Sequence, residues 1–407
     1  MRNALIIAVI STASLANSAL AKPVVVKPIV DARLRYETVD QAGVAGDADA
    51  LTVRVRAGAT AKASDFTFLV EGEGTLAIVE KYNSGVNGKI GAVIPDPENI
   101  ELNRAQVQFT GLSKTIITAG RQRINLDDQR FVGAVAWRQN EQTFDAVRAE
   151  WSGIKGVKAD LTYAWSQRTI WGVDGFGTRQ QAVSGDNIFV NLGYKGKTFG
   201  LTGFAYLVDM DEAAVQAFRF SSKTFGARAN ATVPMGKAKL NLIASYATQS
   251  DYANNPNNSR ADYLLGEAML DVKGFKLTAG YEVLSADNGV ALSSFQAPLG
   301  TLHKFNGWAD KFLTTPANGL RDLYLGLGFA PKVKALPGLN AVVTWHQFKS
   351  DRLNQNFGIE WNAQLSFKVS KRVTFLTKYA DYTRKGVADF AGDADTRKFW
   401  AQFDYAL

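Results

Sequence analysis

The chain has 407 residues, 46% of them hydrophobic and 21% charged, and its mean hydropathy of −0.11 excludes both a disordered chain and a polytopic helical membrane protein. It contains no cysteine and only two histidines, which excludes a disulfide framework and a cysteine-built metal site. The formal net charge of +8 is too modest for this length to indicate a nucleic-acid partner.

Residues 1–21 have the pattern of a secretory signal peptide. Arg2 precedes an apolar run at residues 4–10, and a small-x-small pattern ends at Ala21. The run is shorter than the roughly 20 residues that a helical membrane span requires. We therefore expect cleavage after Ala21 and export of residues 22–407, which form a single domain.

After this leader, apolar and polar residues alternate with a period of two. Between Asn356 and Val369, every odd-numbered residue is apolar and every even-numbered one is polar or glycine. Such alternation predicts half-buried β-strands. About 18 strands are expected, beginning near Ile29, Leu51, Phe66, Asn99, Lys114, Thr143, Gly156, Asp186, Lys197, Lys223, Gly236, Arg260, Phe275, Arg321, Pro337, Asn356, Lys371 and Thr396.

Short and long connections between these strands alternate. The short ones are expected near residues 64–65, 112–113, 153–154, 196, 234–235, 274, 330–336 and 370–371. The longest of the others run through residues 80–98, 123–142, 169–185 and 286–320. Bacterial outer-membrane barrels have short periplasmic turns and long extracellular loops, whereas a soluble β-sandwich has no reason for this alternation. The pattern predicts an all-β fold, a transmembrane antiparallel up-and-down barrel.

The apolar strand faces are suited to contact with lipid. Leu323, Leu325 and Leu327 share one such face, and aromatic residues recur near strand ends, as in the aromatic belts of membrane proteins. Residues 399–407 form an amphipathic last strand that resembles the terminal signal of outer-membrane barrels, although Leu407 replaces the usual aromatic residue. Expected partners are outer-membrane lipid, lipopolysaccharide and the barrel-assembly machinery.

The opposite faces are expected to line the lumen and are rich in arginine. Alternation places these arginines inside: Arg33, Arg35, Arg54, Arg56, Arg104, Arg148, Arg168 and Arg228. Acidic residues such as Glu71 and Glu73 share this face. Two interpretations remain open. The charges form a lateral ladder of ion pairs, or unpaired guanidinium groups form a track that attracts carboxylates, which arginine can bind bidentately.

One stretch resembles a known family. Residues 120–125, Gly-Arg-Gln-Arg-Ile-Asn, are followed by Phe131, Trp137 and Asn140, and then by Thr-Phe-Asp-Ala-Val-Arg at residues 143–148. This combination is similar to the alginate export porin family, in which a Gly-Arg-Gln stretch precedes a strand containing Asp-Ala-Val-Arg. In that family, an 18-stranded outer-membrane barrel passes an anionic uronate polymer through an arginine-rich constriction.

The resemblance implies specific constriction residues here. They are Arg121, Arg123 and Arg148, with Asp145 bracing them, although alternation alone leaves the faces of the first two open. The alginate exporter closes its pore partly with a long periplasmic turn near its carboxyl end. The matching turn here, at residues 370–371, is minimal. A general porin of the same family is therefore at least as consistent with the sequence as a polymer exporter.

The loop at residues 286–320 is the longest and is unusually aromatic. It either folds over or into the mouth of the barrel as a partial lid, or packs on itself outside.

Two acidic pairs, Asp47 with Asp49 and Asp393 with Asp395, lie in the first and last long loops, which barrel closure would bring together. Four carboxylates at this seam could hold Ca²⁺ through oxygen ligands.

An enzymatic barrel would need a nucleophilic serine beside a histidine on the outer face near its rim. His346 is expected to point inward without a serine on its strand face, and His303 lies in a loop. No catalytic site and no cofactor are expected. A secreted soluble lyase or lectin would lack the lipid-facing bands and the terminal strand signal.

The sequence thus predicts a bacterial outer-membrane channel for passive diffusion of small anionic solutes, such as carboxylates or uronates, through an arginine-lined lumen. The alternative is a dedicated exporter of an anionic exopolysaccharide such as alginate.

Overall fold

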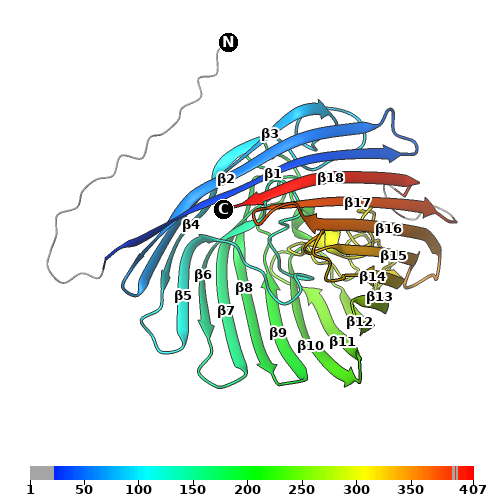
Figure 1. Cartoon of the computed structure of the whole chain (residues 1–407). Coiled ribbons are helices and arrows are strands. Elements are labelled where there is room, and N and C mark those ends of the chain that lie inside the picture. Colours follow the sequence, from blue (N-terminus) through cyan, green and yellow to red (C-terminus); the bar gives the residue numbers. More distant parts are fainter. Residues whose placement is uncertain (1–22, 387–389, 391–392) are drawn as a thin grey trace, which may run out of the picture.

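The computed structural model of the chain describes residues 23–386, 390 and 393–407. In this part of the chain, eighteen antiparallel strands form one sheet that closes into a barrel (Figure 1). The predicted fold class and strand number are confirmed. The expected signal peptide, residues 1–21, lies outside the described residues.

The strands of the first half are β1 (Val25–Gln41), β2 (Ala48–Ala63), β3 (Phe66–Lys81), β4 (Asn99–Phe109), β5 (Thr115–Gln122), β6 (Thr143–Trp151), β7 (Val157–Arg168), β8 (Ala182–Lys195) and β9 (Phe199–Val208). Those of the second half are β10 (Ser222–Met235), β11 (Ala238–Asp251), β12 (Arg260–Val272), β13 (Phe275–Leu284), β14 (Leu320–Phe329), β15 (Asn340–Lys349), β16 (Asn356–Lys368), β17 (Val373–Arg384) and β18 (Thr396–Ala406). Two short 3-10 helices, η1 (Gln216–Phe218) and η2 (Leu302–Lys304), lie in loops. None of the helices in the described ranges is long and apolar enough to cross a membrane.

Closure comes from the pairing of the first and last strands. Each strand pairs with its neighbours in sequence, and β1 also pairs with β18, from Asp31 opposite Ala406 to Gln41 opposite Thr396. The described sheet therefore has no unpaired edge at which another chain could add a strand.

Every strand begins within four residues of its predicted start. The largest differences are at β1 and β8, which begin at Val25 and Ala182. The extra residues of β1 include Pro28, which lies opposite Ala59 in the ladder although proline is unfavourable inside strands.

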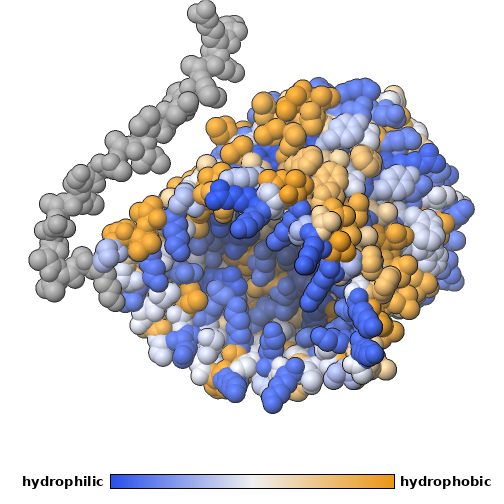
Figure 2. All heavy atoms as spheres, in the orientation of Figure 1, coloured by the Kyte–Doolittle hydropathy of each residue, from blue (hydrophilic) through white to orange (hydrophobic). Residues whose placement is uncertain are grey.

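The outer wall is apolar. Leu323, Leu325 and Leu327 of β14 are 40%, 49% and 61% exposed, as expected of side chains whose natural contact is lipid rather than protein. Figure 2 shows hydrophobic residues on the outer wall and hydrophilic residues around the hollow of the barrel.

Phe357 departs from the predicted face of its strand. The sequence places it outside with Trp361, but Phe357 is fully buried against Phe312 and Phe390, while Trp361 is exposed. A bulge explains the difference, because Phe348 pairs with Gly358 and the next pair skips Phe357. One unpaired residue reverses the side on which its side chain lies.

The short turns lie at the predicted places with one shift. Residues 234–235 end β10 instead of forming a turn, and the chain reverses at residues 236–237. Gly236 has φ +62°, and Lys273 and Gly274 of another two-residue turn have φ of 53° and 93°. Tight hairpins require such left-handed residues because their twist must match that of the strands.

Candidate functional site: two loops that cross the lumen

Two long loops fold into the barrel instead of remaining outside. The first inner loop, residues 123–142, joins β5 to β6, and the second inner loop, residues 285–319, joins β13 to β14. Both carry fully buried apolar residues, such as Ile124 in the first and Phe295 in the second, which pack against inward-facing side chains of the wall. For the loop predicted at residues 286–320, the structure thus favours the partial lid over a self-packed outer loop.

The two inner loops are bonded to each other. Val132 and Leu299 form a parallel bridge, and the amide of Gly133 donates to the Leu299 carbonyl at 2.9 Å. The Thr301 amide donates to the carbonyl of Gln129 at 2.9 Å. The loops therefore form one unit inside the lumen.

Phe131 anchors one end of this unit. Its ring lies 5.2 Å from the rings of both Phe204 on β9 and Tyr263 on β12, and 5.7 Å from that of Phe295 in the second inner loop. Such aromatic contacts stabilise by more than their buried area alone.

Trp137 anchors the other end. The Arg35 guanidinium of β1 lies 4.1 Å from the Trp137 ring centroid and donates to the Trp137 carbonyl at 2.6 Å. The His303 ring stacks on the Trp137 ring at 4.5 Å, and the Lys378 ammonium of β17 lies 4.2 Å from that ring. Since Phe131 contacts β9 and β12 while Trp137 contacts β1 and β17, the first inner loop reaches from one wall of the lumen to another.

A buried ionic network, centred on Asp310, holds the loops at the Trp137 end. Arg138 lies 3.0 Å from Asp310 and 3.1 Å from Glu37 of β1. Asp310 also contacts Lys398 of β18 at 2.8 Å and Nδ1 of His303 at 2.7 Å. Burial would raise the pKa of the Asp310 carboxyl, but His303, Lys398 and Arg138 hold that pKa well below its usual range. Asp310 is therefore a carboxylate shared by three groups.

Most of the predicted lumen arginines do face inward. Arg33, Arg35, Arg54, Arg56, Arg104, Arg148 and Arg228 do so from strands, and Arg123 from the start of the first inner loop. Arg33 also donates to the carbonyl of Trp137 at 2.9 Å, so it helps to hold the first inner loop.

Arg121, Asp145 and Arg168 are corrections, because they lie on the outer face. Arg121 pairs with Asp145 across β5 and β6, and Asp145 lies two residues from Val147, which is 43% exposed on the lipid-facing side. Arg168 pairs with Thr143, on the same face as Asp145. Residues two apart on a strand share a face. Asp145 braces Arg121 as expected, at 2.8 and 3.0 Å, but these side chains do not line the pore.

All ten predicted arginines have a carboxylate within 4.0 Å. Ten pairs account for them: Arg33–Asp404, Arg35–Asp96, Arg54–Asp31, Arg56–Glu73, Arg104–Glu71, Arg121–Asp145, Arg123–Glu141, Arg148–Asp160, Arg168–Asp145 and Arg228–Asp128. The geometry agrees with a ladder of ion pairs rather than a track of unpaired guanidinium groups. Arg35, Arg54 and Arg56 are buried, whereas the Arg123 side chain is 31% exposed.

The predicted calcium site does not form. The first and last long loops do meet, since the Ala42 amide donates to the Asp395 carbonyl at 2.9 Å. However, no cluster of three or more metal-ligating side chains occurs among the described residues. Asp49 binds Tyr36 and Lys81, Asp393 accepts from Tyr382, Asp395 accepts from the Arg384 amide, and Asp47 is exposed.

Cavities lie on both sides of the inner loops. A cavity of about 260 Å³ on the extracellular side touches Arg138, Gln142 and His303. Two cavities of about 380 Å³ each lie toward the periplasmic turns, one of them lined by Lys304 and Trp308. The extracellular cavity shares no lining residue with these two.

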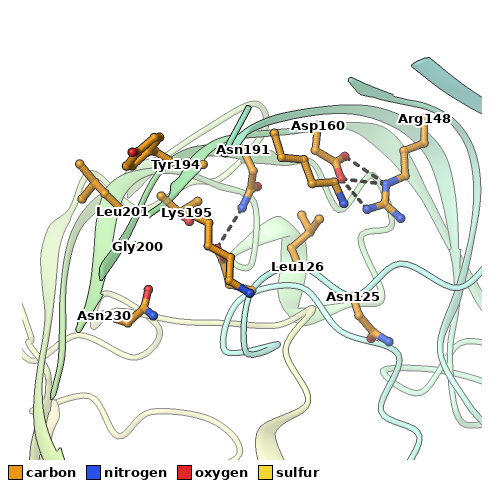
Figure 3. Close-up of a pocket in the computed structure, with 15 residues that line it drawn as sticks. Asn125, Leu126, Arg148, Asp160, Asn191, Tyr194, Lys195, Gly200, Leu201 and Asn230 are labelled. Carbon is orange, nitrogen blue, oxygen red and sulfur yellow. Dashed lines mark hydrogen bonds and ion pairs between the residues drawn. The ribbon is translucent and has the colours of Figure 1, made fainter. Parts of the chain in front are cut away.

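Figure 3 shows the other periplasmic cavity, on the wall of β6 to β10. Arg148 pairs with Asp160 at its upper edge, and Asn191 donates to Asp127 of the first inner loop at 2.9 Å. Lys195 also lines this cavity, without a carboxylate within 4.0 Å in the described structure. The lining thus combines cations with amides that can bind polar solutes.

Sequence reasoning missed the residues that hold the inner loops. Trp137, Arg138 and Asp310 lie in loops, where no alternation assigns a face. The signals in the sequence were the length of both loops, the aromatic content of the second, and the place of Trp137 in the stretch that carries the family resemblance.

Residues 29–179 match the alginate export family, which confirms the resemblance over that part of the chain. No curated protein matches the sequence. The fold is similar to that of OccAB1 from Acinetobacter baumannii, with 12% identity, a TM-score of 0.73 and coverage of 94% of this chain and 96% of that chain. It is also similar to OpdK with vanillate (10% identity, TM-score 0.70) and OpdL (16% identity, TM-score 0.67), both from Pseudomonas aeruginosa and both with coverage of 94% of this chain and 98% of theirs. The closed 18-stranded barrel and its apolar outer wall place the chain in the bacterial outer membrane.

Proposed function

We propose that the chain is an outer-membrane porin through which small solutes, with a preference for carboxylates, diffuse passively. The observation that carries this proposal is the first inner loop, which reaches from the β1 and β17 wall to the β9 and β12 wall. An 18-stranded barrel without such a loop would enclose a wide aqueous channel. The loop narrows that channel and leaves cavities of about 260 and 380 Å³ on its two sides.

The lumen arginines support the preference for carboxylates. Arg123, Arg148 and Arg228 have side chains that are 31%, 14% and 17% exposed, so a solute carboxylate can compete with their carboxylate partners in the first inner loop and on β7. Lys195 adds a cation in the periplasmic cavity. Because a solute carboxylate exchanges with the carboxylate that each arginine already binds, it would be held only weakly at each arginine, as passage through a channel requires. One of the similar structures, OpdK, has been solved with the carboxylate vanillate.

Export of a uronate polymer is the second candidate, favoured by the family match over residues 29–179. The inner loops argue against it, because a polymer would have to pass a unit bonded to several walls. The turn between β16 and β17, residues 369–372, is also short. We therefore rank export below diffusion of small solutes.

Neither histidine supports an enzyme. His303 is bonded at both ring nitrogens, to Asp310 at 2.7 Å and to Lys378 at 2.8 Å. His346 contacts Asp322 at 2.9 Å, but no serine lines the cavity that contains it. The histidine–aspartate pair therefore lacks the serine of a serine–histidine–aspartate triad, and the hydroxyl groups in this cavity come from Thr278, Thr344 and Tyr324.

We further propose lipopolysaccharide and the barrel-assembly machinery as partners, beside membrane lipid, and no nucleic acid. The last strand, β18, supports the second of these, because it presents Phe399 and Phe403 on the outer face.

The test is the reversal potential of refolded mature protein in a planar bilayer under a KCl gradient. We expect anion preference that decreases in Arg148→Ala, because Asp160 and Glu150 then lose their guanidinium partner. The control is Arg260→Ala, which removes an exposed arginine at the outer end of β12. Cation preference in the unmodified protein, or an equal change in both variants, would contradict the preference for carboxylates. Absence of conductance would contradict the channel itself.

A further inference from the structure

The extracellular cavity of about 260 Å³ has a lining unlike the rest of the lumen. It lies between the two inner loops and the loops that follow β7 and β9. We infer that it is a binding site for a small uncharged phenol, at which such a compound is held before it passes the inner loops. This inference rests on the proposed function as far as passage is concerned, but binding itself does not require conduction.

The body of the cavity is apolar. Its apolar lining includes Ile170, Val183, Met210, Val215, Phe220 and Leu302. These side chains come from the loops after β7 and β9, from β8 and from η2, so several separate segments converge on one apolar space. Aliphatic and aromatic side chains around a small volume suit a hydrocarbon ring. Polar side chains, including Thr169, Gln180 and Thr314, also line the cavity.

The charged groups at the cavity cancel each other. Arg138 is the only arginine in the lining, and it already contacts Glu37 and Asp310 within 3.1 Å. His303 faces Asp310 on one side and Lys378 on the other. A carboxylate entering this apolar space would lose its water without gaining a free cation, which is costly. The cavity therefore favours an uncharged ligand.

One hydrogen-bond acceptor in the lining lacks a donor. Gln167 is 6% exposed, and its Oε1 is buried without a partner in the described structure. The orientation of the Gln167 amide follows from its neighbour Gln142. Nε2 of Gln142 donates to the carbonyls of Gly133 and Leu299, so Oε1 of Gln142 is left to accept from Nε2 of Gln167, at 2.6 Å. Gln296, by contrast, has both amide atoms bonded to Thr315. A buried acceptor without a partner is unfavourable, so a ligand hydroxyl that reaches it would be stabilising.

An apolar ring with one hydroxyl group fits both features of the cavity, the apolar space and the acceptor that lacks a donor. Its ring fills the apolar space and its O–H donates to Oε1 of Gln167. A methyl ether of the same ring keeps the apolar contact but loses the hydrogen-bond donor. Comparison of the two compounds therefore separates the contribution of the hydrogen bond from that of the apolar contact.

The experiment compares block of the channel current by phenol and by anisole, each added from either side of a planar bilayer. We expect phenol to bind about fivefold more tightly than anisole when added from the extracellular side. Gln167→Leu should remove this difference and leave the anisole block unchanged. The matched control is Gln108→Leu, which alters a glutamine of β4 that donates to Thr118 and lies outside the cavity.

Equal block by phenol and anisole in the unmodified protein would overturn the inference. So would loss of the difference between the two compounds in Gln108→Leu, or equal block by phenol from the two sides of the bilayer. Saturation-transfer NMR on the refolded protein reports binding without conduction. Phenol binding that depends on Gln167 in a protein without conductance would leave the site standing while contradicting the porin. Conductance without phenol binding would contradict the binding site and leave the porin standing.

Discussion

Asp310 is the residue on which the placement of both inner loops depends. It lies in the second inner loop, yet it binds Arg138 of the first inner loop, Lys398 of β18 and His303. Removing one member of a buried ionic network leaves the others uncompensated, which costs more than the pair contributes. A single carboxylate therefore couples two loops to the wall.

We predict that Asp310→Asn destabilises the barrel by about 3 kcal/mol and increases current noise, because Arg138 and Lys398 lose a buried counter-charge. Single-channel recordings and urea unfolding in detergent measure the two effects. Asp351→Asn is the control, since Asp351 pairs with the partly exposed Arg321 at the rim. Equal effects of both substitutions would show that Asp310 has no special role.

The same network gives a pH dependence. The pKa of Asp310 is held well below its usual range, so its contribution to stability is present above the unfolded pKa and is lost only as the pH falls through the low folded pKa. We expect acidification from about pH 7 to about pH 5 to change current noise equally in the unmodified protein and in Asp310→Asn, because Asp310 keeps its charge over this range. Noise that rises on mild acidification in the unmodified protein, but not in Asp310→Asn, would contradict the depressed pKa.

At the scale of elements, strands and loops differ in what the sequence can predict. Strand positions follow from local alternation, and so do the faces of Arg54 and Arg56, because a period of two is imposed by the backbone itself. The assignment was wrong for three residues. The family resemblance placed Arg121 and Asp145 in the pore, and alternation close to a bulge placed Arg168 there, but all three side chains face outward.

The lid formed by the second inner loop was one of two predicted alternatives, but the contacts of both inner loops could not be predicted, for a different reason. Their position depends on contacts between distant segments, such as Trp137 with Arg35 and Phe131 with Tyr263. No short-range pattern in the sequence encodes these contacts. Long aromatic loops indicate only that something other than solvent covers them.

We predict that replacing residues 124–141 with a short Gly-Ser turn increases conductance severalfold while the barrel still folds. The ladder between β5 and β6 remains, so closure of the sheet does not depend on the loop. Shortening residues 252–259, a loop between β11 and β12, is the control and should leave conductance nearly unchanged. Conductance and heat-modifiable migration on gels measure opening and folding. Unchanged conductance after the first replacement would show that the loop does not limit the pore.

For the molecule as a whole, the inward arginines are concentrated on one part of the wall. Inward arginines concentrate on β1, β2, β4 and β6. Inward acidic residues lie on both sides. Glu37, Glu71, Glu73 and Asp160 accompany the arginines. On β12 to β16, where the described residues include no inward arginine, the inward acidic residues are Glu267, Glu282, Asp322 and Glu360. The field across the lumen thus has a direction, and the selectivity of the channel reflects the balance of the two sides rather than the net charge of the chain.

Glu267 tests this balance, because it accepts a hydrogen bond from Tyr324 at 2.6 Å and has no lysine or arginine within 4.0 Å in the described part of the chain. We predict that Glu267→Gln shifts the reversal potential toward stronger anion preference, opposite in sign to Arg148→Ala. The shift should be largest at low ionic strength, since the Debye length is about 30 Å at 0.01 M salt and about 3 Å at 1 M. The glutamine keeps an acceptor for Tyr324, so a change in fold is not expected to contribute. Shifts of the same sign in both variants would show that selectivity comes from the width of the pore and not from the charges on its wall.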